Sequence, residues 1–343
     1  MMRKRHPKAS LPGRRSLLAG VAGAALASLL ATSSPVMAQS GSDAFPERPL
    51  RMVVPFGAGG SDAMARAFAD KLGKVLGQTV YVENRAGAAG LIGSQHVAAA
   101  TPDGYTMLFI GGGSFTPVLI KDLQFDIHSA LKPVICIARG GMTLMVNSAV
   151  PAKTIQEFVE YARQNPGKVN YSHTAGSIVL SAEMLKSRLG FDATAIPYKG
   201  SSQVLMAQLV NEVQMTIDVP FHYMAMMKEG KIRPLLHGGQ DPLPSLPDGP
   251  DLSSVPRLAD IGIDDLIFAV SYGIWVPAGT PDAVVQKLNA AFNEVLKDPE
   301  IRDRLTQASV VPVGGPPEGH AKQIQAEQEM WAKSAKQIGY QPQ

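Results

Sequence analysis

The chain has 343 residues, of which 45% are hydrophobic, a single cysteine and a formal net charge of +3. This length is enough for two domains with sizeable cores, and a single cysteine excludes an intramolecular disulfide. Residues 1–38 contain 6 of the 32 basic residues and none of the 29 acidic ones, so the remaining chain has a net charge of −3, which argues against a nucleic-acid-binding surface.

The first 38 residues have the pattern of an export signal. Basic residues precede an apolar run from Leu17 to Ala31, and Val36-Met37-Ala38 supplies small residues at a cleavage site. Arg14-Arg15 followed by Ser16-Leu17-Leu18 indicates the twin-arginine type, with an ordinary Sec signal as the alternative. The apolar run is short for a membrane span and no comparable stretch follows, so we expect export to the periplasm rather than a membrane anchor.

One stretch after this signal combines a strand, a bare turn and a helix start. An apolar strand at residues 50–54 runs into a glycine-rich turn at 57–60, and apolar residues at helical spacing follow from Met64. Ser61 or Asp62 is the expected N-cap. A bare turn at a helix N-terminus exposes backbone N–H groups and a partial positive charge, which suits an anion. An ordinary connection without a ligand is the alternative.

Strands and helices alternate along the rest of the chain. Strands are expected at residues 79–84, 105–110, 133–138, 143–147, 169–172, 193–198, 213–218, 233–237 and 272–277. Helices are expected after the small-residue turns at 87–90, 173–177 and 199–202, between 218 and 233, after Thr154, Thr280 and Asp298, and from about 318 to 338. Over residues 50–110 the order strand–helix–strand–helix–strand implies a parallel sheet with helices on its faces. Residues 240–256 are rich in Pro, Asp, Ser and Gly, and indicate a long surface loop.

Enzyme motifs are missing from this sequence. Gly57-x-Gly59 places Asp62 where a dinucleotide fingerprint needs its third glycine, and no Walker or Gly-x-Ser-x-Gly pattern occurs. The six histidines after the signal show no metal-ligand spacing, so we expect no catalytic residues, no metal and no cofactor. Cys136 lies in an apolar run and is expected to be a buried small hydrophobe.

The ends of several predicted strands run into small-residue turns. Ligands of open parallel sheets bind outside the carboxyl ends of the strands, so these turns are the expected binding site. Gly112, Ser114 and His173 are candidates on this ground, with His173 a possible imidazolium contact. Each helix terminus contributes roughly 0.3–1 kcal/mol toward an anion, so two or three must act together. The residues thus predict a protein that captures an anion through backbone N–H groups and hydroxyls.

Six short blocks occur in one order between about residue 46 and residue 339. They are Val53-Val54-Pro55-Phe56-x-Ala58-Gly59-Gly60, Val82-Glu83-Asn84-Arg85-x-Gly87-Ala88, Pro102-Asp103-Gly104-Tyr105-Thr106, Asn165-Pro166-Gly167-Lys168, Pro197-Tyr198-Lys199-Gly200 and Pro277-Ala278-Gly279-Thr280-Pro281. With these blocks the chain resembles the periplasmic solute receptors of the tripartite tricarboxylate transporter type, also called Bug or TctC-like proteins.

The resemblance implies an α/β, two-lobed, type II periplasmic-binding fold, in which each lobe is a central sheet flanked by helices. Lobe 1 would comprise residues 44–140 and 272–343, and lobe 2 residues 141–271, with chain crossings near 141 and 271. The ligand-binding residues carried over from the family, together with Gly59 of the same turn, are Phe56, Gly57, Ala58, Gly59, Ser61 and Asp62 in one lobe and Ser172, Thr174, Gly176, Ser177 and Asp218 in the other.

The resemblance further implies a non-enzymatic, monomeric receptor for a small carboxylate, such as a di- or tricarboxylate, which it delivers to transporter membrane subunits. A receptor for a membrane sensor kinase and a periplasmic hydrolase are the alternatives. Two loops depart from the family pattern. Gly59-Gly60-Ser61-Asp62 is one residue shorter than usual, and Ser172–Ser177 is about two residues shorter. The family's histidine in the helix that follows is Val179 here, so we expect a reshaped pocket.

Overall fold

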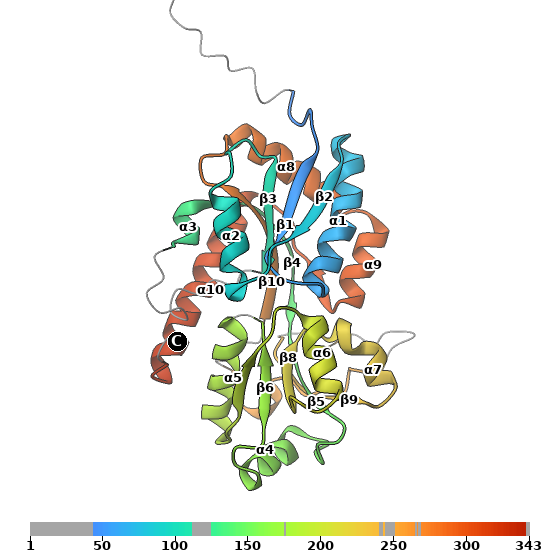
Figure 1. The fold of residues 1–343 in the computed structure, drawn as a ribbon, viewed down its shortest axis with the longest axis vertical. Coiled ribbons are helices and arrows are strands. Elements are labelled where there is room, and N and C mark those ends of the chain that lie inside the picture. The colour runs from blue at the N-terminus through green and yellow to red at the C-terminus, as the bar shows by residue number, and fades with distance from the viewer. Residues whose placement is uncertain are drawn as a thin grey trace, which may run out of the picture. The chain divides into compact units, whose positions relative to one another are not determined.

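Two mixed β-sheets, each with helices packed against it, make up the described part of the chain (Figure 1). The computed structural model describes residues 44–111, 125–174, 176–239, 243, 251–264, 266 and 269–340. The expected export signal lies outside these ranges. Within them, no helix is both long enough and apolar enough to cross a membrane.

The first sheet has the strand order β11-β4-β10-β3-β1-β2. Its strands are β1 (Leu50–Val54), β2 (Val80–Asn84), β3 (Thr106–Gly111), β4 (Leu131–Gly141), β10 (Ala269–Pro277) and β11 (Val310–Pro312). β1 is parallel to β2 and β3, as the alternation of strands and helices predicts. β10 is antiparallel to β3 and β4, and β11 to β4, so the sheet as a whole is mixed. The reason is that β10 returns from the second sheet and enters between β3 and β4.

Helices cover both faces of this sheet. They are α1 (Gly60–Leu76), η1 (Ala88–Gly90), α2 (Leu91–Ala98), α3 (Ile127–Ala130), α8 (Asp282–Val295), α9 (Pro299–Gln307) and α10 (Pro317–Gln337). Two of these helices begin as the sequence indicates or nearly so. Asp298 caps α9 by accepting from the backbone N–H of Glu300, with Pro299 at the first position. α8 begins at Asp282, with Pro281 rather than Thr280 in the N-cap position.

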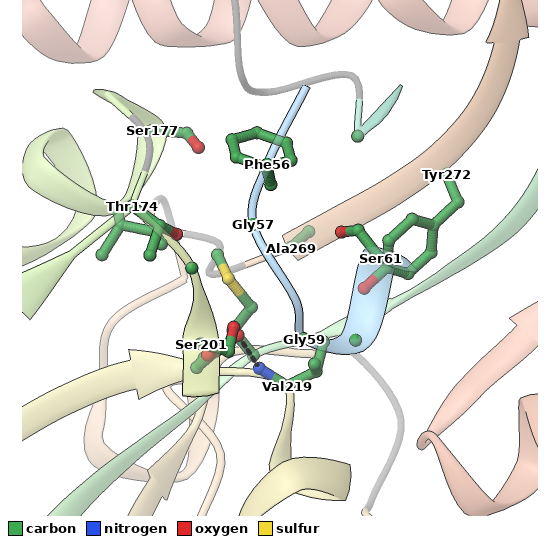
Figure 2. A pocket seen from close by; sticks show the side chains of 16 residues that line it. Phe56, Gly57, Gly59, Ser61, Thr174, Ser177, Ser201, Val219, Ala269 and Tyr272 are labelled. Carbon is green, nitrogen blue, oxygen red and sulfur yellow. Dashed lines mark hydrogen bonds between the residues drawn. The ribbon is translucent and has the colours of Figure 1, made fainter. Parts of the chain in front are cut away.

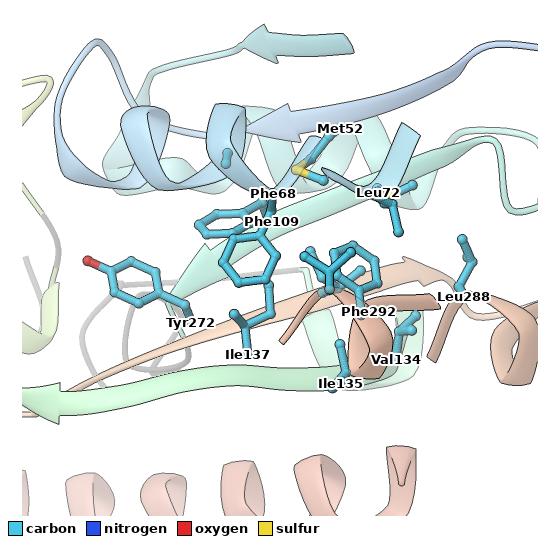
Figure 3. Close-up of a cluster of buried hydrophobic side chains, with 14 of the residues drawn as sticks. Met52, Phe68, Leu72, Phe109, Val134, Ile135, Ile137, Tyr272, Leu288 and Phe292 are labelled. Carbon is cyan, nitrogen blue, oxygen red and sulfur yellow. The ribbon is translucent and has the colours of Figure 1, made fainter. Parts of the chain in front are cut away.

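The alternation of side chains along the strands divides the first core into two layers, and Figure 3 shows the layer that contains Met52. Met52 packs with Phe68 of α1 and Phe292 of α8 on one face, whereas Val53 packs with α2, α3 and α10 on the other. Successive side chains of a strand point to opposite faces, so a sheet covered on both sides needs apolar residues at every position. This is why the predicted strands read as unbroken apolar runs.

The second sheet has the order β7-β6-β8-β5-β9, with β6 parallel to β7 and β8, and β5 antiparallel to β8 and β9. Its elements are β5 (Thr143–Asn147), α4 (Ile155–Gln164), β6 (Asn170–His173), α5 (Gly176–Leu189), β7 (Thr194–Pro197), α6 (Ser201–Leu209), β8 (Met215–Asp218), η4 (Pro220–Tyr223), α7 (Met224–Lys228), β9 (Ile232–His237) and η5 (Ala259–Ile261). Thr154 caps α4, accepting from the backbone N–H of Glu157 at 3.1 Å, as its sequence predicts.

The chain passes between the sheets twice, from β4 to β5 and from β9 to β10. α10 contacts both cores. Ile324 belongs to the apolar cluster of the first sheet, whereas Trp331 and Ala335 belong to that of the second. The expected lobe limits assign this helix wholly to the first lobe, but its C-terminal half packs on the second sheet beside α5.

Cys136 is buried in β4, as its apolar surroundings predict. Burial raises the pKa of its thiol to about 12, and thiolate is the reactive form of cysteine. We expect the native protein to resist a disulfide reagent such as dithionitrobenzoate at mildly alkaline pH, and to react fully once unfolded in urea. Rapid labelling of the native protein would show that Cys136 is accessible and reactive.

Candidate functional site

A cavity of about 70 Å³ lies between loops of the two sheets, and we call it the loop cavity (Figure 2). It is lined by Phe56, Gly57, Gly59, Gly60, Ser61, Gly111, Met142, Thr174, Ser177, Ile178, Gly200, Ser201, Asp218, Val219, Ala269 and Tyr272. Most of these residues come from the carboxyl ends of β1, β3 and β8 and from the starts of three helices, and Met142, Ala269 and Tyr272 lie where the chain passes between the sheets. Strand ends and helix starts therefore converge on one small space.

The loop after β1 lines the cavity with glycines, whose backbone is not covered by side chains. α1 begins at Gly60, its N-cap is Gly59, and no side chain caps it. The expectation that Ser61 or Asp62 is the N-cap is therefore wrong: both lie inside the first turn, because the chain enters the helix as soon as the glycine turn ends. The first N–H groups of an α-helix have no partner within the helix, so this end offers donors and partial positive charge to the cavity.

Two helices of the second sheet also begin at the cavity. Ser177 lies in the first turn of α5, and Ser201 is the first residue of α6, whose N-cap Gly200 has no side-chain cap either. Thr174, just before α5, adds a hydroxyl. Three helix N-termini and four serine or threonine hydroxyls, that of Ser61 included, thus line one cavity, an arrangement that suits a small anion.

The loops of the two sheets touch beside the cavity. The backbone N–H of Gly57 donates to the carbonyl oxygen of Lys199 at 3.0 Å. A Cβ atom at Gly59 would lie 3.3 Å from the backbone nitrogen of Ser201, and one at Gly60 would lie 2.2 Å from Nε2 of His222. A side chain at Gly60 would require His222 to move, and one at Gly59 would crowd Ser201, so glycine at these positions allows the close approach of the two segments.

Asp218 is the single charged residue among the described residues that line the cavity. Its Oδ1 accepts from the backbone N–H of Val219 at 2.8 Å, and its Oδ2 accepts from the hydroxyl of Tyr223 at 3.0 Å. Burial, helped by Asp218, raises the pKa of Tyr223 well above its ordinary value, so this phenol remains a hydrogen-bond donor. Two neutral donors, the backbone N–H of Val219 and the hydroxyl of Tyr223, therefore hold the Asp218 carboxylate in place beside the cavity.

Tyr272 and His222 flank this carboxylate. Burial is the main cause that raises the pKa of Tyr272, and its phenol lies beside Ser61 (Figure 2). Burial lowers the pKa of His222, although Asp218 opposes the shift, so the imidazole is neutral near pH 7. Its Nε2 is buried and has no hydrogen-bond partner among the residues described.

Seven of the fourteen residues predicted for the site line the loop cavity: Phe56, Gly57, Gly59, Ser61, Thr174, Ser177 and Asp218. Five more are described but are not among its lining residues: Ala58, Asp62, Ser172, His173 and Gly176. Gly112 and Ser114 lie outside the described residues.

The side chains that do not line the cavity have other neighbours. Asp62 pairs with Arg66 on α1, at 3.0 Å between Oδ1 and Nη2. The hydroxyl of Ser172 lies 2.8 Å from that of Thr216 inside the second sheet. Ala58 is exposed, and burial lowers the pKa of His173, which favours its neutral form over an imidazolium.

Nine lining residues were not predicted: Gly60, Gly111, Met142, Ile178, Gly200, Ser201, Val219, Ala269 and Tyr272. For Gly200 a signal exists, because the block Pro197-Tyr198-Lys199-Gly200 follows a predicted strand as the first turn does. Met142, Ala269 and Tyr272 lie where the chain passes between the sheets, and they carry no motif. Among the described residues no cluster of histidine, cysteine, aspartate or glutamate could hold a metal ion.

A family model for the tripartite tricarboxylate transporter family receptor matches residues 64–340. A protein encoded in the tcbD-tcbE intergenic region of Pseudomonas sp. strain P51 is 34% identical over 326 residues, covering 94% of this chain and 93% of that protein.

Solved structures are similar as well. The periplasmic binding protein BugD is 30% identical with a TM-score of 0.80, covering 87% of this chain and all of BugD. R. palustris Rpa4515 with adipate is 32% identical with a TM-score of 0.81 at the same coverage. MatC from Rhodopseudomonas palustris with bound malate is 27% identical with a TM-score of 0.78, covering 84% of this chain and 99% of that one. The chain therefore has the fold of the periplasmic binding proteins and belongs to the tripartite tricarboxylate transporter receptor family of solute-binding proteins.

Proposed function

We propose that this protein captures a small organic carboxylate in the loop cavity and delivers it in the periplasm to the membrane subunits of a tripartite tricarboxylate-type transporter. The convergence of three helix N-termini on one cavity is the observation that carries the proposal. Each terminus stabilises an anion by roughly 0.3–1 kcal/mol when exposed and up to about 2 kcal/mol when partly buried. Three together supply a few kcal/mol without a cationic side chain.

The relatives with known ligands support a carboxylate. Adipate is bound by Rpa4515 and malate by MatC, and both are dicarboxylates. In this chain the only charged lining residue described is Asp218, which repels a ligand carboxylate placed beside it. We therefore expect one ligand carboxylate to lie at the helix starts, away from Asp218, with the rest of the ligand against Phe56 and Tyr272.

The cavity suits binding better than hydrolysis. Ser61, Ser177 and Ser201 line it, and none of these hydroxyls has an imidazole or amine partner among the described residues. A serine nucleophile needs such a base at hydrogen-bond distance. We therefore propose a receptor without catalytic activity.

Calorimetric titration of the mature protein with adipate, malate and their uncharged diamides tests this function. We expect saturable binding of at least one dicarboxylate and no binding of its diamide. Nuclear magnetic resonance spectra of the ligand after incubation are expected to be unchanged, and a product signal would overturn the receptor proposal. Equal binding of acid and diamide would overturn the anion site.

Two hydroxyl variants locate the ligand. Ser177→Ala and Ser61→Ala each remove one hydroxyl from a helix start, and a hydrogen bond to a charged group contributes roughly 1.5–3 kcal/mol. We expect about tenfold or greater weakening of the best dicarboxylate in each variant. Ser202→Ala, an exposed neighbour on α6 that does not line the cavity, is the matched control and is expected to bind as the wild type does. Unchanged binding in both cavity variants would place the ligand elsewhere.

A further inference from the structure

A second and larger cavity, of about 600 Å³, lies where the chain passes between the sheets, and we call it the crossover cavity. It is lined by residues of β4, β9, β10, β11, α9 and α10, among them Arg139, Val311, Glu327 and Met330. Ala269 is the only described residue that lines both this cavity and the loop cavity. Its volume is typical of pockets that hold organic molecules.

Arg139 is exposed and lines the crossover cavity. In the sheet it lies opposite Ser271 of β10 and Val311 of β11. Its guanidinium makes no hydrogen bond or ion pair with any other described residue. A guanidinium presents several fixed donors that match the oxygens of carboxylate, sulfate or phosphate groups.

The carboxyl of Glu327 also lines the crossover cavity, and the charge of Arg139 opposes the rise in its pKa that burial causes, with no hydrogen bond or ion pair between the two side chains. Glu327 of α10 is half-buried, and its two oxygens accept from the hydroxyl of Ser271 at 3.2 Å and from Nε2 of Gln323 at 2.8 Å. Both partners are neutral. The cation at the exposed side of the cavity therefore remains available, whereas the carboxylate is already hydrogen-bonded.

The cavity also has an apolar wall. Val310 is buried, Val311 is 57% exposed, and Pro312 and Met330 complete the wall. β11 is an edge strand, and charged side chains are common on such strands, whereas Val311 presents an apolar side chain to solvent. A wall of this kind gains free energy when an apolar group covers it.

We propose that the crossover cavity is a second binding site, which takes an amphipathic organic anion with its charged head on Arg139 and its apolar body against Val311 and Met330. Calorimetric titration with decanoate tests it, with decyltrimethylammonium as the probe of equal chain length and opposite charge. We expect decanoate to bind and the cationic probe to bind at least about tenfold more weakly. Equal binding of the two probes, or no binding of decanoate, overturns the proposal.

Variants assign the binding to this cavity. Arg139→Gln is expected to weaken decanoate about tenfold or more. The matched control Arg302→Gln removes an exposed arginine of α9 that does not line the cavity, and should leave the affinity unchanged. Equal effects of the two substitutions contradict the site.

Two substitutions of opposite charge at the same exposed position distinguish a contact with the ligand's charged head from an effect on folding. Val311→Lys and Val311→Glu alter the same side chain at the surface, so both variants should fold. We expect decanoate to bind Val311→Lys more tightly than Val311→Glu by about tenfold. Equal affinity in the two variants would exclude an anion at this wall.

Discussion

Replacing Gly60 with alanine is expected to weaken dicarboxylate binding at the loop cavity by about tenfold or more, with little change in the stability of the unliganded protein. The new Cβ would lie 2.2 Å from Nε2 of His222, a buried atom of η4, which follows β8 of the second sheet. Overpacking of this kind costs roughly 1–3 kcal/mol, and 1.4 kcal/mol corresponds to a factor of ten in affinity. We expect the unliganded protein to relieve the clash by separating the two loops, whereas binding at the loop cavity needs both loops together.

A second substitution tests this explanation. His222→Ala clears the space beside Gly60, so the double variant Gly60→Ala/His222→Ala should bind the dicarboxylate within about threefold of His222→Ala alone. Gly319→Ala on α10 is the matched control, because a Cβ there meets no atom within 4 Å. The explanation fails if the double variant binds no better than Gly60→Ala. Affinities are measured by calorimetry and stabilities by urea unfolding.

The stability of the protein is expected to fall by up to about 3 kcal/mol between pH 6.5 and pH 4 because of His320 alone. This imidazole is buried on α10, its ring centre is 5.2 Å from that of Trp275, and neither nitrogen has a partner among the described residues. Burial lowers its pKa from 6.5 to about 4. The unfolded chain therefore takes up the proton as the pH falls below about 6.5, while the folded protein does so only near pH 4.

The contribution of neutral His320 to the free energy of unfolding is therefore complete above about pH 6.5 and is lost as the pH falls toward 4. His320→Leu removes the titrating group and replaces it with an apolar side chain of similar size. Urea unfolding across this pH range should therefore give a shallower loss of stability in the variant than in the wild type. His96→Leu, which alters a half-buried histidine of α2, should retain most of the wild-type loss. Identical pH dependence in the wild type and in His320→Leu would show that His320 is not responsible.

Most of the secondary structure was predictable because its signals are local. β5 has the expected bounds, Thr143–Asn147, and β1, β2 and β3 pair in parallel as the alternation of strands and helices implies. β11 was missed, because three residues are too few to show a period. The antiparallel insertion of β10 was missed too, since strand order depends on how the chain returns from the other sheet and not on its own residues.

The candidate site was predictable only in part. The glycine turn after β1 and the hydroxyls of Thr174 and Ser177 could be predicted from their place between a strand and a helix, and they line the loop cavity. Asp62 and Ser172 have the same residue types as true cavity residues, but their side chains turn to Arg66 and Thr216 instead. A residue type at a strand end indicates a site, and the direction of its side chain decides whether it faces that site.

By itself the sequence determined the family, the parallel order of the first three strands and the bare turn at the start of α1. These features follow from periodicity, turn residues and short blocks, which all act over a few neighbouring residues. Only the tertiary structure decided that the turn at Gly57 meets the loop at Lys199, that Tyr272 and Asp218 line the loop cavity, and that Arg139 lines a second cavity without an ion pair to another described residue. Such contacts join residues far apart in the chain, and they depend on how two sheets pack, which no local pattern encodes.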